Sequence, residues 1–199
     1  MLNMDDRLRS QIGFMLELDK MKTLYRQTYV LNEDRKENDA EHSWHLAVMA
    51  FLLAEHSNQP VDVLKVMKMV LIHDVVEIDA GDTYCYDAEG NKTKAEREEK
   101  AAQHIFGLLP VDQKEEFYAL WREFEEAATA DSKFANLLDR LQPILLNYTR
   151  DGISWKEHGV YSDQVRARNL HSSEASDDIA AIIEDIISDA EAQGFLKSR

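Results

Sequence analysis

The sequence contains little cysteine, proline or glycine, and it lacks a long hydrophobic run. Its one cysteine, Cys85, excludes a disulfide within the chain, so nothing points to an oxidising compartment. Three prolines and seven glycines are too few for a linker-rich or disordered chain. Charges interrupt the N-terminal residues before any apolar segment, and no apolar run reaches the roughly 20 residues of a membrane-spanning helix. These absences predict a folded cytoplasmic protein with no membrane partner.

Positive charge is also scarce. The chain has 23 Lys and Arg against 38 Asp and Glu, which gives a formal net charge of -15. The phosphate backbone of a nucleic acid needs a cationic surface, so we expect no nucleic-acid polymer as a partner. A small phosphorylated molecule needs only a local cationic pocket and is not excluded. We interpret most of the acidic surface as solvated charge that aids solubility.

Helical periodicity dominates the hydrophobic pattern. With 199 residues, 44% of them hydrophobic, the chain suits one domain with a substantial core. Apolar residues recur at spacings of three and four, and no stretch shows a convincing β-strand alternation. Helices are expected over 6–24, 40–55, 61–78, 94–108, 110–128, 132–148, 163–169 and 176–192, with loops at 82–92 and 151–162. The sequence predicts an all-α fold of about seven to nine helices, in one domain over 1–199 with its core at about 10–170.

Two of these helices have local start signals, and the last one has a clear apolar face. Asp39 is expected to cap the helix over 40–55, and Pro60 suits the start of the helix over 61–78. The segment 176–192 carries isoleucines at spacings of three and four, which makes it amphipathic. This helix could pack onto its own domain or form the interface of a dimer, and the sequence leaves both interpretations open.

The segment LIHDVVEIDAGDT, residues 71–83, places polar side chains in the most apolar of the expected helices. His73 and Glu77 are four residues apart, and Asp74 and Glu77 are three apart, so all three share one broad face of a helix. A buried charge usually pairs or coordinates a metal. From this segment alone, a solvated polar edge and a metal-binding or catalytic face are both open interpretations.

A second polar motif, AEHSWH at residues 40–45, carries His42 and His45. A lone histidine is more often a hydrogen-bonded core or surface residue than a metal ligand. Two helices that carry His42 and the pair His73 and Asp74 could nevertheless converge. Imidazole combined with carboxylate suits Mn, Fe, Co, Ni or Zn better than Ca. The HExxH pattern of zinc proteases is absent, because HDVVE lacks the second histidine.

The motifs EHSWH, LIHDVVEIDAGDT about 30 residues later and then KFANLLDRLQP resemble the HD-domain metal-dependent phosphohydrolases. Within them, the chain is similar to the bacterial 5'-deoxynucleotidases and the small HD-domain proteins related to them. The resemblance covers roughly residues 10–170 and implies a helical HD-domain fold. It also implies one divalent cation, either a transition metal (Mn, Co, Zn, Ni or Fe) or Mg. The metal ligands that it implies are His42, His73, Asp74 and Asp139.

The resemblance also implies roles for three further residues. Glu77 is the candidate catalytic acid or base, and Asp82 is expected to position the substrate or the attacking water. Arg26 matches an arginine that contacts the substrate in the nucleotidases, where a tryptophan follows it. Here Gln27 stands in place of that tryptophan, which leaves the nucleotide preference open. Because relatives in this family often dimerise, a homodimer is also expected.

The assignment of Asp139 as a metal ligand depends on the resemblance alone. Its helix has a stripe of Phe134, Leu137, Leu138 and Leu141, and Asp139 lies on the flank of that stripe. Periodicity would therefore place it at the surface. The neighbouring Arg140 is expected to form a structural salt bridge, and four other cationic residues are weaker candidates for phosphate contacts: Arg35, Lys92, Lys94 and Arg97.

The hypothesis that we prefer is an enzyme, a metal-dependent phosphohydrolase that cleaves nucleoside or deoxynucleoside 5'-monophosphates. A second hypothesis keeps the site but changes the substrate to a phosphodiester, a triphosphate or a guanosine polyphosphate. A third is a non-catalytic helical binding module stabilised by metal. The presence of both Glu77 and Asp82 favours an enzyme over such a module.

Overall fold

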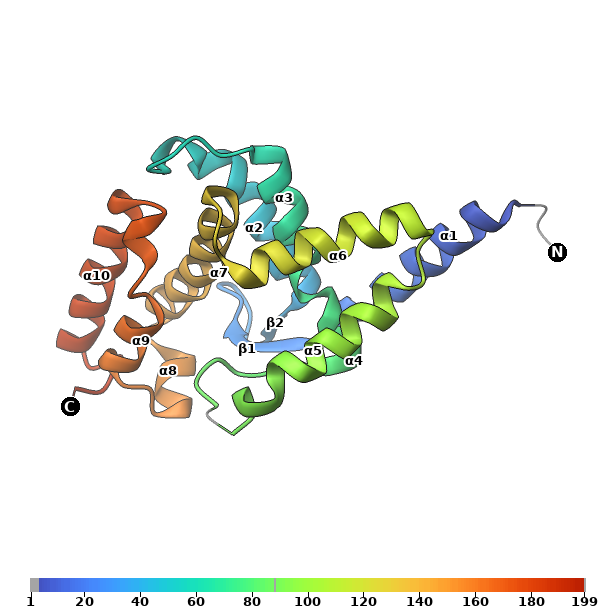
Figure 1. The fold of residues 1–199 in the computed structure, drawn as a ribbon. Coiled ribbons are helices and arrows are strands. Elements are labelled where there is room, and N and C mark those ends of the chain that lie inside the picture. The colour runs from blue at the N-terminus through green and yellow to red at the C-terminus, as the bar shows by residue number, and fades with distance from the viewer. Residues whose placement is uncertain (1–3, 88, 199) are drawn as a thin grey trace.

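The structure, a computed structural model, describes residues 4–87 and 89–198 (Figure 1). Within these residues the all-α prediction is confirmed, with one small two-stranded sheet added. None of the helices that they form is long and apolar enough to cross a membrane. The strands are β1 (Tyr25–Tyr29) and β2 (Lys36–Asn38). The helices are α1 (Asp6–Leu18), α2 (Asp39–Leu53), α3 (Val63–Ile72), α4 (Glu77–Ala80), α5 (Asn91–Phe106), α6 (Val111–Glu126), α7 (Ala130–Thr149), α8 (Ile153–His158), α9 (Ser162–Arg168) and α10 (Asp177–Ala192).

Both predicted helix starts were wrong by a residue or two. Asn38, not Asp39, caps α2: its side chain accepts a hydrogen bond from the Glu41 backbone, and the Glu41 carboxylate accepts one from the Asn38 backbone. This reciprocal capping box satisfies two free backbone donors, more than a single cap achieves. Asp62, not Pro60, begins α3 by accepting from the Lys65 backbone. Asp39 is consequently left inside the first turn of α2 and fully buried.

The helix expected over 61–78 is interrupted. α3 ends at Ile72, a 3₁₀ turn covers His73–Val76, and α4 follows at once. A 3₁₀ turn has about three residues per turn instead of 3.6. The interruption therefore falls on the polar residues, and His73, Asp74 and Glu77 are all buried.

The sequence pattern missed the hairpin of β1 and β2 and the helix α8. β1 and β2 pair antiparallel, with Tyr25 opposite Asn38 and an irregular register before Tyr29. A ladder this short and irregular shows no clean alternation of polar and apolar residues. The second element is α8, which lies in the expected loop over 151–162 and has six residues between Gly152 and Gly159, both with positive φ. In Figure 1 the hairpin lies at the centre of the molecule, below α7, and it carries Arg26.

The core consists of two clusters of buried side chains. The larger one joins α2, α3, α7 and α10, and the smaller one joins α1, α5 and α6. In α10, Ile179, Ile183 and Ile187 are buried against the rest of the same chain. The packing interpretation of this helix is therefore confirmed. The packing of α7 on α2 and α3 brings together the polar residues of three distant segments.

Candidate active site

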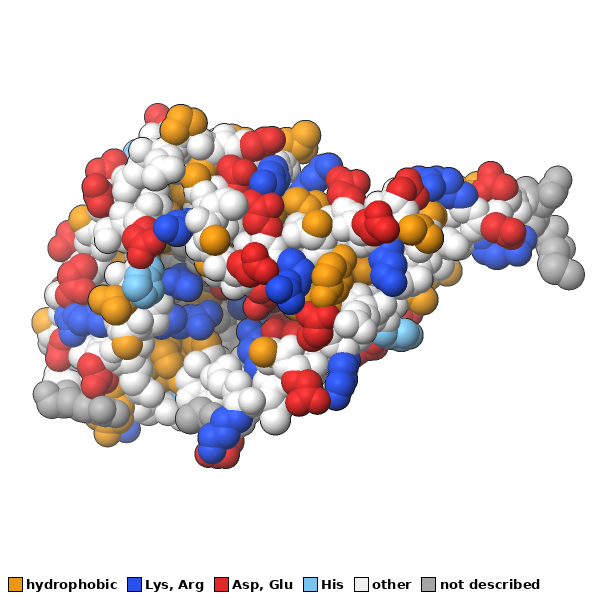
Figure 2. Space-filling model, in the orientation of Figure 1, with side chains coloured by type: hydrophobic (Ala, Val, Ile, Leu, Met, Phe, Trp, Pro, Cys, Tyr) orange, Lys and Arg blue, Asp and Glu red, His pale blue; other side chains and the backbone are white. Residues whose placement is uncertain are grey.

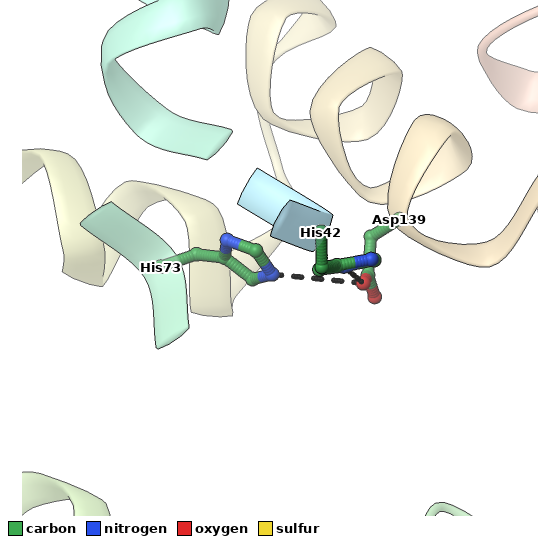
Figure 3. Close-up of side chains that lie close together, drawn as sticks. All are labelled: His42, His73 and Asp139. Atoms are coloured by element: carbon green, nitrogen blue, oxygen red, sulfur yellow. Dashed lines mark hydrogen bonds and ion pairs between the residues drawn. The ribbon is translucent and has the colours of Figure 1, made fainter. Parts of the chain in front are cut away.

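α2, α7 and the 3₁₀ turn after α3 direct His42, Asp139 and His73 toward one another (Figure 3). The Nε2 atom of His42 lies 3.0 Å from Asp139 Oδ1, and that of His73 lies 3.6 Å from the same oxygen. The potential ligand atoms of the three residues all lie within 4.8 Å of one another. Asp74 Oδ1 lies 3.1 Å from His73 Nε2, so the four ligands implied by the resemblance converge.

The tautomer of His73 is set by the backbone. Its Nδ1 lies 2.9 Å from the carbonyl oxygen of Val70, which can only accept, so Nδ1 carries the proton. In the neutral ring, the form that binds a metal, the lone pair of Nε2 consequently faces the carboxylates. This nitrogen is buried and has no aligned hydrogen-bond partner. Burying a polar atom without a partner is costly, and a metal ion bound at Nε2 would satisfy it.

A buried network orients His42 in the same way. Its Nδ1 lies 3.2 Å from Gln142 Oε1, and the Gln142 amide donates to Glu37 Oε1 at 2.6 Å. The Nε2 atom is thereby turned toward Asp139. Sequence reasoning missed both Glu37 and Gln142. The only available signal was the position of Gln142, four residues after Leu138, on the apolar stripe of its helix.

A second cluster of carboxylates adjoins the histidines. Potential ligand atoms of Asp39, Asp74 and Glu77 lie within 4.8 Å of one another, and all three residues are buried. Neither oxygen of Asp39 has a hydrogen-bond partner. Arg26 lies beside the cluster, with Nη1 2.5 Å from Asp74 Oδ2 and 3.7 Å from Asp39 Oδ1. Its charge offsets part of the negative charge collected there.

The pKa values of the site diverge strongly. Burial, followed by the charge of Asp74, raises the pKa of Asp39 to about 7 and that of Glu77 well above its usual value. For Asp139, burial is outweighed by the hydrogen bonds of His42 and His73, which hold its pKa well below the usual range. Burial lowers the pKa of His73, but the charges of Asp74 and Asp139 raise it more. Without a cation, the site is thus expected to retain protons at neutral pH.

We expect the chelated protein to become less stable as the pH rises from about 5 to 8. The folded state holds the Asp39 proton up to a pKa of about 7, against 3.8 for an ordinary aspartate carboxyl group. A raised carboxyl pKa contributes stability that is lost as the pH rises through this window, and the raised pKa of His73 acts in the same direction. Thermal unfolding with chelator should show a fall in Tm of about 5 °C or more. Asp39→Asn should flatten the profile, and a profile identical to wild type would contradict the assignment.

A pocket opens over these residues. Arg26, His73, Asp74, Glu77, Asp82 and Asp139 all line it, while His42 is buried behind them. Of the weaker phosphate candidates only Lys94 reaches the lining. Arg35 and Lys92 pair with nearby glutamates, and Arg97 donates to the Ala80 carbonyl and to Thr83. Trp155 is 3% exposed and lines the same pocket.

The predicted salt bridge of Arg140 was wrong. Among the described residues Arg140 has no hydrogen bond and no ion pair, although it lines the pocket beside Asp139. Arg168, at the end of α9, also lines the pocket and was not singled out from the sequence. No local pattern marks it, since its place depends on the packing of α9 near α7.

Comparison with known proteins identifies the family. The sequence profile of the HD domain matches residues 18–180. The chain belongs to the HD domain family. This HD domain protein is similar in structure to a predicted metal-dependent phosphohydrolase of Magnetospirillum magnetotacticum MS-1. The TM-score is 0.91 at 48% identity, over 96% of this chain and 95% of the other. An HD-domain phosphohydrolase of Listeria innocua, 16% identical with a TM-score of 0.69, shares the fold.

Curated relatives of this HD domain protein bear an enzyme name. The human 5'-deoxynucleotidase HDDC2 is 32% identical over 138 residues, and the Xenopus laevis protein of the same name is 30% identical. The match covers 69% of this chain and 66% of the human protein, just under two thirds of its length. The resemblance inferred from the sequence motifs is therefore confirmed.

Proposed function

We propose that this HD domain protein is a metal-dependent phosphohydrolase that cleaves the phosphomonoester of nucleoside or deoxynucleoside 5'-monophosphates. The observation that carries the proposal is the buried Nε2 of His73 in the pocket. It has no aligned hydrogen-bond partner and lies 3.1 Å from Asp74 Oδ1 and 3.6 Å from Asp139 Oδ1. The names of the curated relatives support the choice of substrate.

The residues present fit a divalent cation. His42 and His73 each offer Nε2, and Asp74 and Asp139 offer carboxylate oxygens. Two imidazoles among four ligands favour a transition metal such as Mn, Co, Zn, Ni or Fe, although Mg also accepts carboxylates. When bound, such an ion would polarise the phosphoryl oxygens and lower the pKa of a water molecule.

Glu77 is suited to move the proton of the attacking water. It is 4% exposed, its Oε2 has no hydrogen-bond partner, and its pKa is raised well above the usual value, first by burial. A carboxylate whose pKa is raised is a stronger base than an ordinary one, so it can both take and return a proton. Glu77 would accept a proton from water as the oxygen attacks phosphorus, and return it to the leaving oxygen of the nucleoside. Asp82, on the pocket wall, would orient that water or the substrate.

Arg26 is suited to hold the phosphate. Its pKa is raised because the neighbouring carboxylates outweigh its burial, so its charge is permanent. A guanidinium has five donors in a planar fork, and the Asp74 contact uses only one nitrogen. Aromatic side chains complete the pocket: Tyr84, Tyr86 and Trp155 line it, and aromatic rings suit a nucleobase by stacking.

Phosphate release from a panel of substrates tests the proposal. The protein would be chelated, given back Mn²⁺, Co²⁺, Zn²⁺ or Mg²⁺, and assayed with nucleoside and deoxynucleoside 5'-mono-, di- and triphosphates and with a phosphodiester. We expect metal-dependent release, with His73→Ala reducing it at least about 100-fold because a metal ligand is lost. Release from the phosphodiester or the triphosphate alone would show that this compound, and not a monophosphate, represents the substrate class. No release from any compound would favour the hypothesis of a non-catalytic binding module. The single domain, the cytoplasmic location and the homodimer stay predictions.

A further inference from the structure

Two arginines in the pocket lack the partners that the other arginines have. Arg140 of α7 makes no hydrogen bond and no ion pair within the described residues. Arg168 has one contact, from Nη2 to Asp139 Oδ2 at 3.8 Å, and the metal site proposed above requires the same carboxylate. Elsewhere Arg150 and Arg166 each make several hydrogen bonds. In a chain with a net charge of -15, an unpaired Arg140 beside an Arg168 with a single 3.8 Å contact requires an explanation.

The two guanidinium groups also repel each other. Burial lowers the pKa of Arg140 most, and the nearby charge of Arg168 lowers it further. Arg140 is partly buried on the pocket wall, so its charge is incompletely solvated. The single contact of Arg168 with Asp139 leaves Arg140 without a partner. An anion bound between the two guanidinium groups would offset the repulsion and provide the absent hydrogen bonds.

The arginine pair is separate from the phosphate contact proposed for Arg26. The two oxygens of Asp139 face two different arginines: Oδ1 lies 3.8 Å from Arg26 Nη2, and Oδ2 lies 3.8 Å from Arg168 Nη2. Arg26 and Arg168 thus approach different oxygens of one carboxylate. Figure 2 shows Lys and Arg side chains gathered around the hollow in the middle of this face. The pocket accordingly offers two cationic positions, Arg26 at one and the pair Arg140 and Arg168 at the other.

We propose that Arg140 and Arg168 form a subsite for a second phosphoryl group, so that the preferred substrate is a nucleotide with two phosphates. This inference rests on the proposed function and refines its substrate class. Water would attack the phosphorus nearest His42 and His73, the P–O bond to the nucleotide would break, and the leaving oxygen would receive the proton. The phosphoryl group held by Arg140 and Arg168 would remain on the product. A nucleoside 5'-diphosphate and a nucleoside 3',5'-bisphosphate both supply this chemistry.

The test compares binding and turnover of three ligands: an adenosine 5'-monophosphate, 5'-diphosphate and 3',5'-bisphosphate. Dissociation constants would be measured by calorimetry on metal-loaded Glu77→Gln protein, which slows turnover, and KM and kcat on the wild-type background. Arg140→Gln and Arg168→Gln would be compared with Arg122→Gln, which removes the same charge from α6 outside the pocket. Arg140→Lys would keep the charge but lose the planar fork.

We expect wild-type protein to bind one of the two-phosphate ligands at least about 10-fold more tightly than the monophosphate, since charge-assisted hydrogen bonds have this magnitude. Arg140→Gln and Arg168→Gln should both remove that preference, and Arg140→Gln should change the monophosphate constants less than about 2-fold. The Tm of Arg140→Gln should not fall, because an unpaired, repelled cation adds no stability. Whichever two-phosphate ligand loses affinity in these variants shows whether the second phosphate is part of a 5'-diphosphate or lies at the 3' position. Equal losses for all three ligands, no preference in wild type, or a lower Tm of Arg140→Gln would each overturn the subsite. If no nucleotide is hydrolysed but the binding preference and its loss are found, the subsite stands and the proposed reaction fails.

Discussion

Asp139→Asn is expected to reduce kcat/KM at least about 100- to 1,000-fold and to abolish tight binding of the cation. The Asp139 carboxylate lies at the centre of the site, 3.0 Å from His42 Nε2 and within 4 Å of two arginines. An amide keeps the shape but removes the negative charge and turns one oxygen into a donor. Both histidines would then lack one of the carboxylates that raise their pKa. The measurements are phosphate release and the metal content of the purified variant.

A matched control for Asp139→Asn is Asp185→Asn. Asp185 is exposed on α10, so the same chemical change there should leave metal content and turnover within about 2-fold of wild type. Wild-type metal stoichiometry in Asp139→Asn would show that Asp139 is not a ligand, whatever the activity. Loss of activity with the metal retained would instead assign Asp139 a role in positioning the substrate.

Glu77→Gln is expected to lower kcat about 100- to 10,000-fold while leaving the metal content unchanged. Glu77 belongs to the carboxylate cluster and not to the group formed by His42, His73 and Asp139. The amide cannot accept the proton of the attacking water. Because Glu77 is buried beside Asp39 and Asp74, a neutral side chain should leave Tm equal or higher, especially above pH 7.

Glu98→Gln separates proton transfer from a general loss of charge. Glu98 lines the same pocket, is 4% exposed and has a pKa raised to about 7, chiefly by burial. It pairs with Lys94 at 3.4 Å and belongs to neither group of candidate ligands. We expect a change in kcat below about 10-fold for this variant. Similar losses in Glu77→Gln and Glu98→Gln would argue that Glu77 acts only through the electrostatic potential of the pocket.

Asp39 shows where local reasoning fails. Its position before an apolar helical segment made it a sound N-cap candidate, yet Asn38 and Glu41 form the cap and Asp39 is fully buried in the acidic cluster. Arg140 shows the opposite error, since the sequence suggested a salt bridge and the described structure contains none. Both errors have one cause: a side chain's neighbours come from other elements, and the spacing along its own helix carries no information about them.

By itself the sequence determined most helices, the motif that carries His73, Asp74 and Glu77, and the HD family, because these depend on local periodicity or on short motifs. Only the tertiary structure decided how the 3₁₀ turn arranges those three residues and which residues surround them. His42 meets Asp139 across 97 residues, and Gln142 meets Glu37 across 105. Such contacts are made by the packing of α7 on α2 and α3 and by the hairpin of β1 and β2. This hairpin is too short to show an alternation of polar and apolar residues in the sequence. The metal ligands could thus be named from their motifs, whereas Glu37, Asp39, Gln142 and the Arg140 and Arg168 pair required the folded chain.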